Sequence, residues 1–374
     1  MKILNINSYY YSSSVHRHLQ NAIQGQGIDS ISYVPLAKGY IPRDECKYEY
    51  NEHVVISECY NAIDRYIFHV KHTKILREIN KQINLLDFDC LHAHSLFSNG
   101  YISMKINEKL GIPYMVAVRD TDVNTFFKYM VHLRSMGIKI LERSSSIIFL
   151  SPSYRNFLIQ KYVPKRIRET VFAKSMIIPN GIDGFWLRNK NYSKKMPNNK
   201  TLKLLYVGTI SKRKNLITTV KTAQLLREIG YDAILTVVGE IIDRAIFNQI
   251  KDLPYVNYIN PMPKENLIKI YRENDIFIMP SITETFGLVY AEAMSQGLPI
   301  IYTKGQGFDG QFEDGVVGYS VNCYDAQDIA NKVISILDKY EECSRNCIEL
   351  CNKFDWDKIA TTYTKVYKDI LNKN

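Results

Sequence analysis

The sequence has few of the features that define disulfide-rich, membrane-spanning or disordered proteins. Its seven cysteines are odd in number and form no Cys-x-x-Cys pair, which excludes a disulfide framework and a zinc site of the usual spacing. No run approaches the roughly 18 consecutive apolar residues that a membrane-spanning helix needs. Charged residues make up 23% and hydrophobic residues 46% of the chain, close to the average of folded soluble proteins.

The length of the chain and its first residues indicate the number of domains and the cellular location. A chain of 374 residues favours two domains, because a single core rarely grows beyond about 250–300 residues. The opening segment MKILNINSYYYSSS turns polar after five residues, whereas a signal peptide continues with an apolar core. We therefore expect a cytoplasmic protein with no spanning segment.

Basic residues are in excess, and most of the excess lies in one stretch. The chain carries 48 Lys and Arg against 38 Asp and Glu, a net charge of +10. Residues 128–174 alone hold ten basic and two acidic side chains, so this stretch contributes +8. Such a patch attracts an anionic membrane surface or an anionic substrate, and a solvated basic face is the alternative. Nucleic acid is not expected, because no nucleic-acid-binding motif accompanies the charge.

Short apolar strands alternate with amphipathic helical stretches in both halves of the chain. This pattern predicts an α/β fold in which a mostly parallel sheet is covered by helices. Strands are expected at residues 1–6, near Cys90, Val116 and Ile148, and at residues 203–208, 233–239, 275–281 and 298–303. Helices are expected from about Val15 and at residues 215–229, 265–274 and 290–294.

The two halves are separated by residues 177–201, which lack apolar periodicity and are rich in Asn, Lys, Gly and Pro. We expect an interdomain linker there. Two Rossmann-like domains joined in this way face each other across a cleft, and such folds bind ligands beyond the carboxyl ends of the strands. The sequence therefore predicts an N-terminal domain at residues 1–183, a second domain at residues 184–355, and an active site in the cleft.

The segment 280–294 carries the clearest chemical pattern. A strand runs into a loop with Glu284, and Gly287 then allows the backbone to approach a ligand before a helix begins near Leu288. The free N–H groups and the dipole of a helix N-terminus favour an anion such as a diphosphate. Glu292, about one turn into the helix, can accept hydrogen bonds from two neighbouring ribose hydroxyls. Either glutamate alone is also explained as a charge in the first turn of a helix.

The two glutamates together, with the strand before them and the Phe-Gly between them, indicate a function more specifically than either glutamate alone. Two glutamates separated by seven residues, with a strand before the first and Phe-Gly after it, resemble the signature of retaining glycosyltransferases of sequence family 4, which have the two-domain GT-B fold. Other segments resemble further motifs of the family: Ile178–Asp183, Tyr206–Gly208, Lys212–Asn215, Val237–Glu240, Tyr271–Ser281, Glu313–Gly315 and Phe354–Trp356. The resemblance covers residues 145–374 well and residues 1–144 only loosely. It implies two Rossmann-like domains across a deep cleft, with a final helix at residues 356–374 that crosses back to the N-terminal domain.

The resemblance also implies individual roles. Lys214 matches the lysine that neutralises the donor diphosphate, Glu284 the acid that orients the donor sugar, and Glu292 the ribose ligand. The nucleotide base of the donor is expected near Met262. The donor-binding residues implied in this way are Gly208, Thr209, Arg213, Lys214, Met262, Glu284, Phe286, Gly287, Leu288 and Glu292. No metal or other cofactor is implied, because a lysine and a helix terminus can carry the diphosphate charge. No Asp-x-Asp stands in a suitable setting: residues 120–122 have this letter pattern, but they lie in the acceptor-side half.

Three departures from the family pattern concern the phosphates and the sugar. Thr209 stands where the family places an arginine, and Arg213 is the expected substitute. Residues 12–14 are serines where relatives have a Gly-Gly loop. Arg119 stands where relatives have a histidine near the sugar, and an arginine cannot act as a base.

Polar residues of the first half complete the predicted site. His92 and His94 follow the third predicted strand, as in family members with His-x-His at this point, and packing at the strand end is the alternative. Asp122 is predicted to contact the sugar or the acceptor, with a helix cap as the alternative. The predicted acceptor or sugar side comprises Ser13, Ser14, His94 and Arg119, and the predicted catalytic residues are Glu284, Lys214 and Asp122.

We expect a retaining, metal-independent enzyme that moves a hexose-type sugar from a nucleotide diphosphate to a hydroxyl of a glycan or lipid-linked acceptor, as in surface polysaccharide or glycoconjugate synthesis. For such enzymes a front-face reaction is proposed, in which the departing phosphate helps to remove the acceptor proton. The rival interpretation is a non-catalytic sugar-nucleotide-binding protein that partners an active transferase, which the three departures would fit.

The basic stretch predicts a contact with the inner face of the cell membrane. A helix expected at Phe126–Arg143 places Met130, Leu133, Ile138 and Leu141 beside basic side chains. An amphipathic helix of this kind lies on anionic lipid and can present a lipid-linked acceptor.

Overall fold

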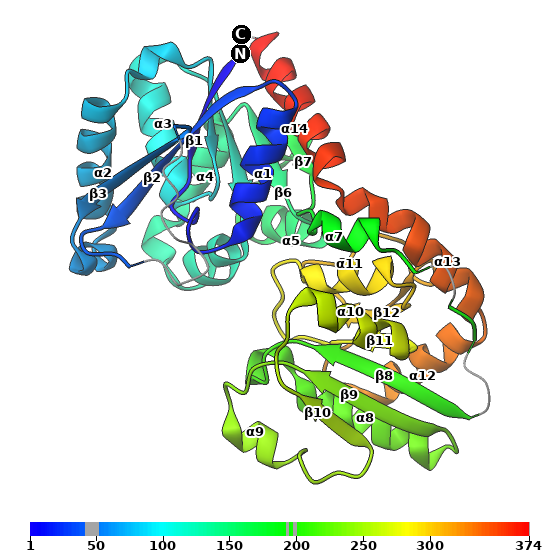
Figure 1. Cartoon of the computed structure of the whole chain (residues 1–374). Helices are drawn as coiled ribbons and strands as arrows, with labels where there is room; N and C mark the ends of the chain where they lie inside the picture. Colours follow the sequence, from blue (N-terminus) through cyan, green and yellow to red (C-terminus); the bar gives the residue numbers. More distant parts are fainter. Residues whose placement is uncertain (42–51, 192–193, 197–199, 374) are drawn as a thin grey trace. The chain divides into compact units, whose positions relative to one another are not determined.

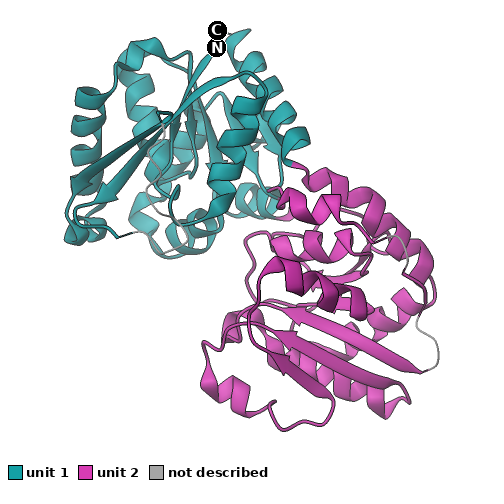
Figure 2. Cartoon of the chain, in the orientation of Figure 1, with its two compact units in different colours: residues 1–150, 154–179, 356–374 teal, residues 151–153, 180–355 magenta. Residues whose placement is uncertain are grey.

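The computed structural model describes residues 1–41, 52–191, 194–196 and 200–373. The chain divides into two units (Figure 2). Unit 1 consists of residues 1–150, 154–179 and 356–374, and unit 2 of residues 151–153 and 180–355. The expected linker at 177–201 contains the short helix α7 (Gly184–Arg188), and its residues 192–193 and 197–199 lie outside the described residues.

Unit 1 is built around a sheet of seven parallel strands (Figure 1). The strands are β1 (Lys2–Ile6), β2 (Asp29–Ala37), β3 (Val54–Tyr60), β4 (Cys90–Ala93), β5 (Tyr114–Val118), β6 (Ser146–Phe149) and β7 (Ser175–Ile177). Their order is β3-β2-β1-β4-β5-β6-β7, so the chain winds outward from β1 in one direction and from β4 in the other. Ligands of doubly wound folds bind at such a reversal, beyond the carboxyl ends of the strands.

Unit 2 repeats this topology with six strands in the order β10-β9-β8-β11-β12-β13. The strands are β8 (Thr201–Val207), β9 (Asp232–Val238), β10 (Val256–Ile259), β11 (Ile276–Ile278), β12 (Ile300–Thr303) and β13 (Gly318–Val321). Every pairing between neighbours is parallel. The reversal lies between β8 and β11. These two sheets confirm the predicted α/β class and the doubly wound architecture.

The central strand β5 of unit 1 is buried along its whole length because helices cover both faces of the sheet. Tyr114, Val116 and Val118 of β5 belong to the core cluster on one face, whereas Met115 and Ala117 belong to the cluster on the other. Side chains alternate between the faces of a strand, so each cluster takes every second residue. A continuous apolar run is therefore what a central strand of this fold requires.

Helices of unit 1 are α1 (Ser14–Gly25), α2 (Phe68–Gln82), α3 (Ser98–Leu110), α4 (Arg134–Arg143), α5 (Pro152–Tyr162), α6 (Arg168–Ala173) and α14 (Trp356–Leu371). Helices of unit 2, besides α7, are α8 (Leu216–Glu228), α9 (Arg244–Asn248), α10 (Lys264–Glu273), α11 (Leu288–Ser295), α12 (Ala326–Leu337) and α13 (Tyr340–Leu350).

The last helix, α14, packs on unit 1 beside α1, although more than 300 residues separate them in the sequence (Figure 1). Its buried residues Ile359, Tyr363 and Ile370 recur at helical spacing and contact the same apolar cluster as Leu19 and Ile23 of α1. Full burial of each such apolar side chain contributes roughly 1.5–3 kcal/mol. The prediction that the C-terminal helix returns to the N-terminal domain is confirmed.

The helix expected at Phe126–Arg143 does not form as one element. A π-helix occupies Asp122–Phe127, a turn of 3-10 helix occupies Val131–Leu133, and only α4 is a regular helix. Leu133 and Leu141 are buried in the core, and Met130 and Ile138 pack against it. These apolar side chains are therefore not available to a membrane, which corrects that part of the prediction. No helix in the described part of the chain is long and apolar enough to span a bilayer.

Candidate functional site

Lys214 and Glu284 form an ion pair at the carboxyl end of the second sheet. The Lys214 ammonium lies 2.5 Å from a carboxylate oxygen of Glu284, and only 12% and 8% of the two side chains are exposed. Lys214 ends a turn of 3-10 helix at Lys212–Lys214, after β8, and Glu284 lies in the loop after β11. Because β8 and β11 are neighbours in the sheet, the two loops meet.

Side-chain hydrogen bonds hold the lysine turn against the end of β11. Asn215, with a φ of 58°, donates through its side-chain amide to the carbonyl oxygens of Pro280 at 3.0 Å and Cys323 at 2.6 Å. Asparagine tolerates this left-handed conformation better than most residues. The guanidinium of Arg213 donates to the carbonyl oxygen of Thr283 at 2.8 Å, so it braces the glutamate loop. Its contact with a donor phosphate stays a prediction.

The backbone of Glu284 is held by the loop after β12. The side-chain oxygen of Gln306 accepts from the N–H of Glu284 at 3.0 Å, and the N–H of Gly307 donates to the carbonyl oxygen of Glu284 at 2.9 Å. A Cβ atom on Gly307 would lie 1.9 Å from the carbonyl oxygen of Thr285, so only glycine allows this approach. The position of the glutamate thus depends on a second loop that the sequence analysis did not assign to the site.

Gly287 begins α11 in a left-handed conformation with φ 77°. A Cβ atom there would lie 2.4 Å from the ring of Tyr290 and 3.2 Å from the Cγ of Glu284, so glycine brings the helix start close to the glutamate. Leu288 is the first helical residue. Phe286 is buried, and its ring lies 5.6 Å from that of Phe354 and takes part in the core. Only the backbone around Phe286 remains for the phosphates.

Glu292 lies on α11 and is half-buried. The Tyr271 hydroxyl donates to its carboxylate at 3.2 Å. Burial raises the pKa of Glu292 to about 7, and the charge of Asp183 adds to this rise, while the Tyr271 hydroxyl and Lys264 oppose it. Lys264 itself forms an ion pair with Asp183. A carboxyl group in this state becomes a better hydrogen-bond acceptor as the pH rises through neutrality. Its contact with a ribose stays a prediction.

Three more predicted donor residues follow strands of the second sheet. Gly208 comes directly after β8, and its carbonyl oxygen would lie 1.9 Å from a Cβ atom on Gly239, so the ends of β8 and β9 touch through their backbones. The Thr209 hydroxyl lies 3.3 Å from the Ser211 hydroxyl. Met262 is half-buried in the loop between β10 and α10. All three follow carboxyl ends of parallel strands, as the fold requires of ligand-binding residues.

Asp122 is enclosed by backbone. Its carboxylate accepts from the N–H groups of Leu96 at 2.9 Å, Phe97 at 3.0 Å and Arg119 at 2.8 Å, and the residue is 1% exposed. Burial raises its pKa to about 6, although the three N–H groups oppose the rise. The geometry favours the capping alternative that the sequence left open. A sugar or acceptor contact for this residue stays a prediction.

The two predicted histidines are buried in unit 1. Their rings stack with 4.0 Å between centroids, His92 shares a hydrogen bond of 2.7 Å with the Tyr367 hydroxyl, and His94 one of 3.1 Å with Asn5. Burial lowers the pKa of His92 to about 3 and that of His94 well below its usual value, so both rings are neutral at neutral pH. Arg119 donates to the carbonyl oxygen of His94 at 3.1 Å. These contacts favour packing over a role in proton transfer.

The serines of the first loop lie at the start of α1. The Ser13 hydroxyl caps the helix by accepting from the N–H of Val15 at 3.4 Å, and Ser14 is the exposed first residue. A capped helix start leaves further N–H groups at this terminus. Their contact with a donor stays a prediction.

Two curated relatives show the range of similarity. The D-inositol 3-phosphate glycosyltransferase of Corynebacterium kroppenstedtii is 31% identical over 123 residues, which are 32% of this chain and 27% of that protein. The chain therefore matches only about a quarter of that relative's length. An uncharacterized glycosyltransferase of Methanocaldococcus jannaschii is 22% identical over 388 residues, which cover 99% of each chain.

Solved structures share the fold. HepE of Anabaena in complex with UDP superposes with a TM-score of 0.72 at 15% identity, over 99% of this chain and 100% of that one. Structures of the same protein with UDP-glucose and with UDP and glucose both superpose with a TM-score of 0.68. At this identity the similarity shows the GT-B fold alone.

Matches to two family models show which protein family the chain belongs to. The model described as Glycosyltransferase Family 4 matches residues 13–184, and the model described as Glycosyl transferases group 1 matches residues 188–350. The two matches follow one another and together span most of the chain. The chain belongs to the GT-B glycosyltransferases of group 1. The family resemblance and the fold predicted from the sequence are thereby confirmed.

The site of this glycosyltransferase extends beyond the residues that the sequence predicted. The structure brings Lys214, Glu284 and Gly287 together, as expected, but it adds Gln306 and Gly307 as supports of the glutamate. The available signal was the glycine-rich run Lys304–Gly310 directly after a predicted strand, which is typical of a close backbone approach. The role of Gln306 could not be predicted, because it depends on a contact across 22 residues of sequence.

Proposed function

We propose that this glycosyltransferase moves a hexose-type sugar from a nucleotide diphosphate to a hydroxyl of a glycan or lipid-linked acceptor, with retention of configuration. The observation that carries the proposal is the Lys214–Glu284 pair of 2.5 Å, next to the start of α11. A cation, a carboxylate and helix N–H groups there can bind the charged and the polar parts of one donor. The solved HepE complexes contain UDP and UDP-glucose, which supports a nucleotide-sugar donor here.

The proposed reaction balances without a metal ion. The bond between the sugar C1 and the phosphate oxygen breaks, and a bond from the acceptor oxygen to C1 forms on the same face. The proton of the acceptor hydroxyl moves to the departing phosphate. Lys214 and the N–H groups at the start of α11 stabilise the charge that builds on the diphosphate, and Glu284 orients the sugar by accepting from its hydroxyls. No protein base is required, so the neutral, buried histidines and Arg119 are compatible with this chemistry.

A screen of donors tests the proposal. The full-length protein is mixed with UDP-, GDP- and ADP-sugars, and the thermal midpoint and slow hydrolysis of each donor are measured. We expect one donor to stabilise the protein and to be hydrolysed by it, but not by Glu284→Gln or Lys214→Ala. Lys221→Ala, at an exposed lysine of α8 outside the donor loops, serves as the control and should retain hydrolysis. Full activity of either site variant would overturn the assignment.

The same screen separates the rival function, a nucleotide-sugar-binding partner of another transferase. Thr209, the serines at 12–14 and Arg119 replace family residues near the phosphates and the sugar, and these replacements favour the rival. It predicts that a donor stabilises the protein while neither hydrolysis nor transfer to any glycan or lipid acceptor occurs.

We also propose that unit 1 binds an anionic membrane surface through residues 128–174, although not through the helix expected from the sequence. Tyr129 and Val131 are 68% and 60% exposed, and Phe157 and Phe172 are also exposed. Cations accompany the three aromatic rings: Lys128 lies 5.0 Å from the ring centroid of Tyr129, Lys161 4.8 Å from that of Phe157, and Arg155 4.3 Å from that of Phe172. Exposed aromatic groups among cations are suited to the interface of an anionic bilayer.

Sedimentation with vesicles tests this contact. We expect binding to vesicles of phosphatidylcholine and phosphatidylglycerol that weakens with added salt, because counter-ions screen the attraction. Val131→Ser should weaken binding, whereas Ile63→Ser, at an exposed residue of unit 1 outside the basic stretch, should not. Equal binding to neutral vesicles, or no effect of salt, would contradict the proposal.

A further inference from the structure

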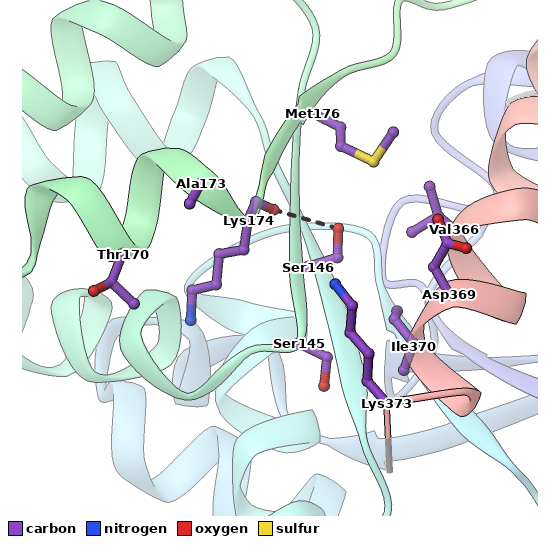
Figure 3. A pocket seen from close by; sticks show the side chains of 10 residues that line it. All are labelled: Ser145, Ser146, Thr170, Ala173, Lys174, Met176, Val366, Asp369, Ile370 and Lys373. Atoms are coloured by element: carbon purple, nitrogen blue, oxygen red, sulfur yellow. Dashed lines mark hydrogen bonds between the residues drawn. The ribbon is translucent and has the colours of Figure 1, made fainter.

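Unit 1 contains a pocket of about 620 Å³ that shares no residue with the predicted donor site (Figure 3). It lies where β6 and β7 begin, between them and the last turns of α14. Asp122 and His94, in contrast, follow the ends of their strands. The pocket is therefore at the opposite edge of the sheet. It is lined by Ser145, Ser146, Thr170, Ala173, Lys174, Met176, Val366, Asp369, Ile370 and Lys373.

The lining divides into an apolar and a polar part. Met176 of β7 and Val366 and Ile370 of α14 supply apolar surface, and Ala173 leaves room beside them. Serine and threonine hydroxyls and two lysines supply the polar part. A pocket of this volume, mostly apolar with a few polar groups, is typical of small-molecule sites.

Lys174 places a positive charge in the polar part. Its ammonium donates to the carbonyl oxygens of Glu142 at 2.7 Å and Ser144 at 2.8 Å, which lie at the end of α4. An ammonium has three N–H groups, so these two bonds leave the third for a ligand. Burial lowers the pKa of Lys174 to about 8, with the charge of Glu142 opposing, so the group is still mainly protonated at neutral pH. An anion would compensate this partly desolvated charge.

Lys373, two residues beyond the end of α14, supplies a second positive charge. Figure 3 shows its side chain extending across the pocket toward Ser146. Asp369, in the last turn of α14, contributes the single negative charge of the lining. Two lysines against one aspartate give the pocket a net positive lining.

We propose that this pocket binds an amphipathic anion, a carboxylate or phosphate monoester on a short apolar body. The charged head contacts Lys174 and Lys373, and the apolar body covers Met176, Val366 and Ile370. No aromatic side chain is among the lining residues, which disfavours a nucleoside base. The apolar surface equally disfavours a free sugar phosphate.

The location gives such a ligand access to both chain segments that connect the units. Met176 precedes the passage of the chain from unit 1 to unit 2 at residues 179–180, and α14 follows the return at residues 355–356. A ligand in the pocket therefore contacts the last strand before the first passage and the helix after the second. It does so without touching any predicted donor residue, so the inference does not rest on the proposed function.

Calorimetry with octyl phosphate, at a concentration below that of micelle formation, tests the proposal. We expect saturable binding of one molecule per chain, and octanol should bind at least about tenfold more weakly because it has no charge for the lysines. Lys373→Gln should weaken octyl phosphate binding by about two- to fivefold, the value of one exposed charged contact. Lys368→Gln, near the end of α14 but outside the pocket, is the matched control and should bind like the wild type.

Ala173→Phe separates the pocket from unspecific adsorption. Ala173 is exposed in the pocket wall, so the ring should fill the space without entering the core, and the thermal midpoint confirms that the variant is folded. Loss of octyl phosphate binding is expected. Unchanged binding in this variant, no saturable binding in the wild type, or equal affinity for octanol would overturn the proposal.

Competition then identifies the source of the ligand. Displacement of octyl phosphate by vesicles that contain a long-chain phosphate monoester would assign the pocket to a lipid. Displacement by short-chain soluble phosphate monoesters alone would assign it to a metabolite.

Discussion

The two units place polar side chains at the same edge of the same kind of sheet, yet they use them differently. In unit 2 two carboxylates at this edge pair with side-chain cations, Glu284 with Lys214 and Asp183 with Lys264, and each also accepts from a backbone N–H group. In unit 1 the carboxylate of Asp122 is bound by three backbone N–H groups, and the neighbouring histidines are buried and neutral.

This difference between the two units indicates which groups are free to bind a ligand. A lysine side chain can give part of its hydrogen bonding to an incoming phosphate, because it has three N–H groups and a flexible stem. Backbone N–H groups at a loop and a helix start cannot move without local unfolding. A carboxylate held by a side chain is thus suited to chemistry, and one held by backbone is suited to stability.

The largest effect is expected at Glu284. Glu284→Gln keeps the shape but removes the charge, and we expect kcat for transfer or donor hydrolysis to fall by about 100-fold or more, as for the loss of a preorganised electrostatic group. The thermal midpoint should stay close to that of the wild type. Steady-state kinetics and thermal unfolding measure the two quantities. A large loss of stability with normal kcat would place Glu284 with Asp122 and break the comparison.

The next effect is expected at Gly307, which supports the glutamate loop. In Gly307→Ala the new methyl group would meet the carbonyl oxygen of Thr285 at 1.9 Å, so the loop must shift. A shift of about 1 Å at a reacting group can cost on the order of 100-fold in rate. Gly25→Ala, where nothing lies within 4 Å of the new atom, is the control. Normal kinetics of the Gly307 variant would show that the loop does not position Glu284.

Asp122→Ala should lower the stability of the protein more than its kcat, the reverse of the effect expected at Glu284. The change leaves three backbone donors in the interior without an acceptor, which costs on the order of 3 kcal/mol or more of unfolding free energy. Chemical denaturation measures this loss, and the kcat of the molecules that remain folded should be nearly unchanged. A variant with normal stability and a raised KM for the acceptor would instead support the sugar or acceptor contact predicted from the sequence.

The smallest effect concerns Glu292, whose pKa burial raises to about 7. The KM for the donor should fall by a few fold between pH 6 and pH 8, because the ionised carboxylate accepts ribose hydroxyls better. The raised pKa also means that the folded state holds its proton more tightly than the unfolded state. The stability contributed by this group is therefore complete below about pH 4.5 and is lost as the pH rises through 7.

Glu292→Gln tests the expected pH dependence of both the donor KM and the stability. It should flatten the dependence of the KM on pH and remove the stability loss between pH 4.5 and 7. An unchanged pH profile would show that another group titrates.

Part of this picture could be predicted from the sequence. The alternation of apolar strands and amphipathic helices repeats in both halves, and it predicts two doubly wound sheets. The segment 280–294 holds its glycine, helix start and glutamates within one local run, so its geometry follows from local rules. The family resemblance implied that Lys214 and Glu284 both serve the donor site, but it did not predict their ion pair, which joins residues 70 positions apart in the sequence.

Other features depended on contacts that no local pattern encodes. The apolar positions of residues 126–143 fit one amphipathic helix, but burial of Leu133 and Leu141 in the core of unit 1 broke the segment into three elements. The same core enclosed Asp122 and the histidines. Their residue types alone were compatible with either a site or a cap.

The sequence by itself determined the fold class and the presence of the same fold in both halves of the chain. The spacing of apolar residues is a local property, and it decides which face of each strand or helix is buried. The sequence also determined the donor motif, whose residues are close along the chain. Only the tertiary structure decided which polar groups remain available to a ligand, which loop holds Glu284 in place, and that a pocket forms among β6, β7 and α14. Burial and hydrogen bonding depend on partners that are distant in the sequence, and those partners meet only when the sheet and its helices are assembled.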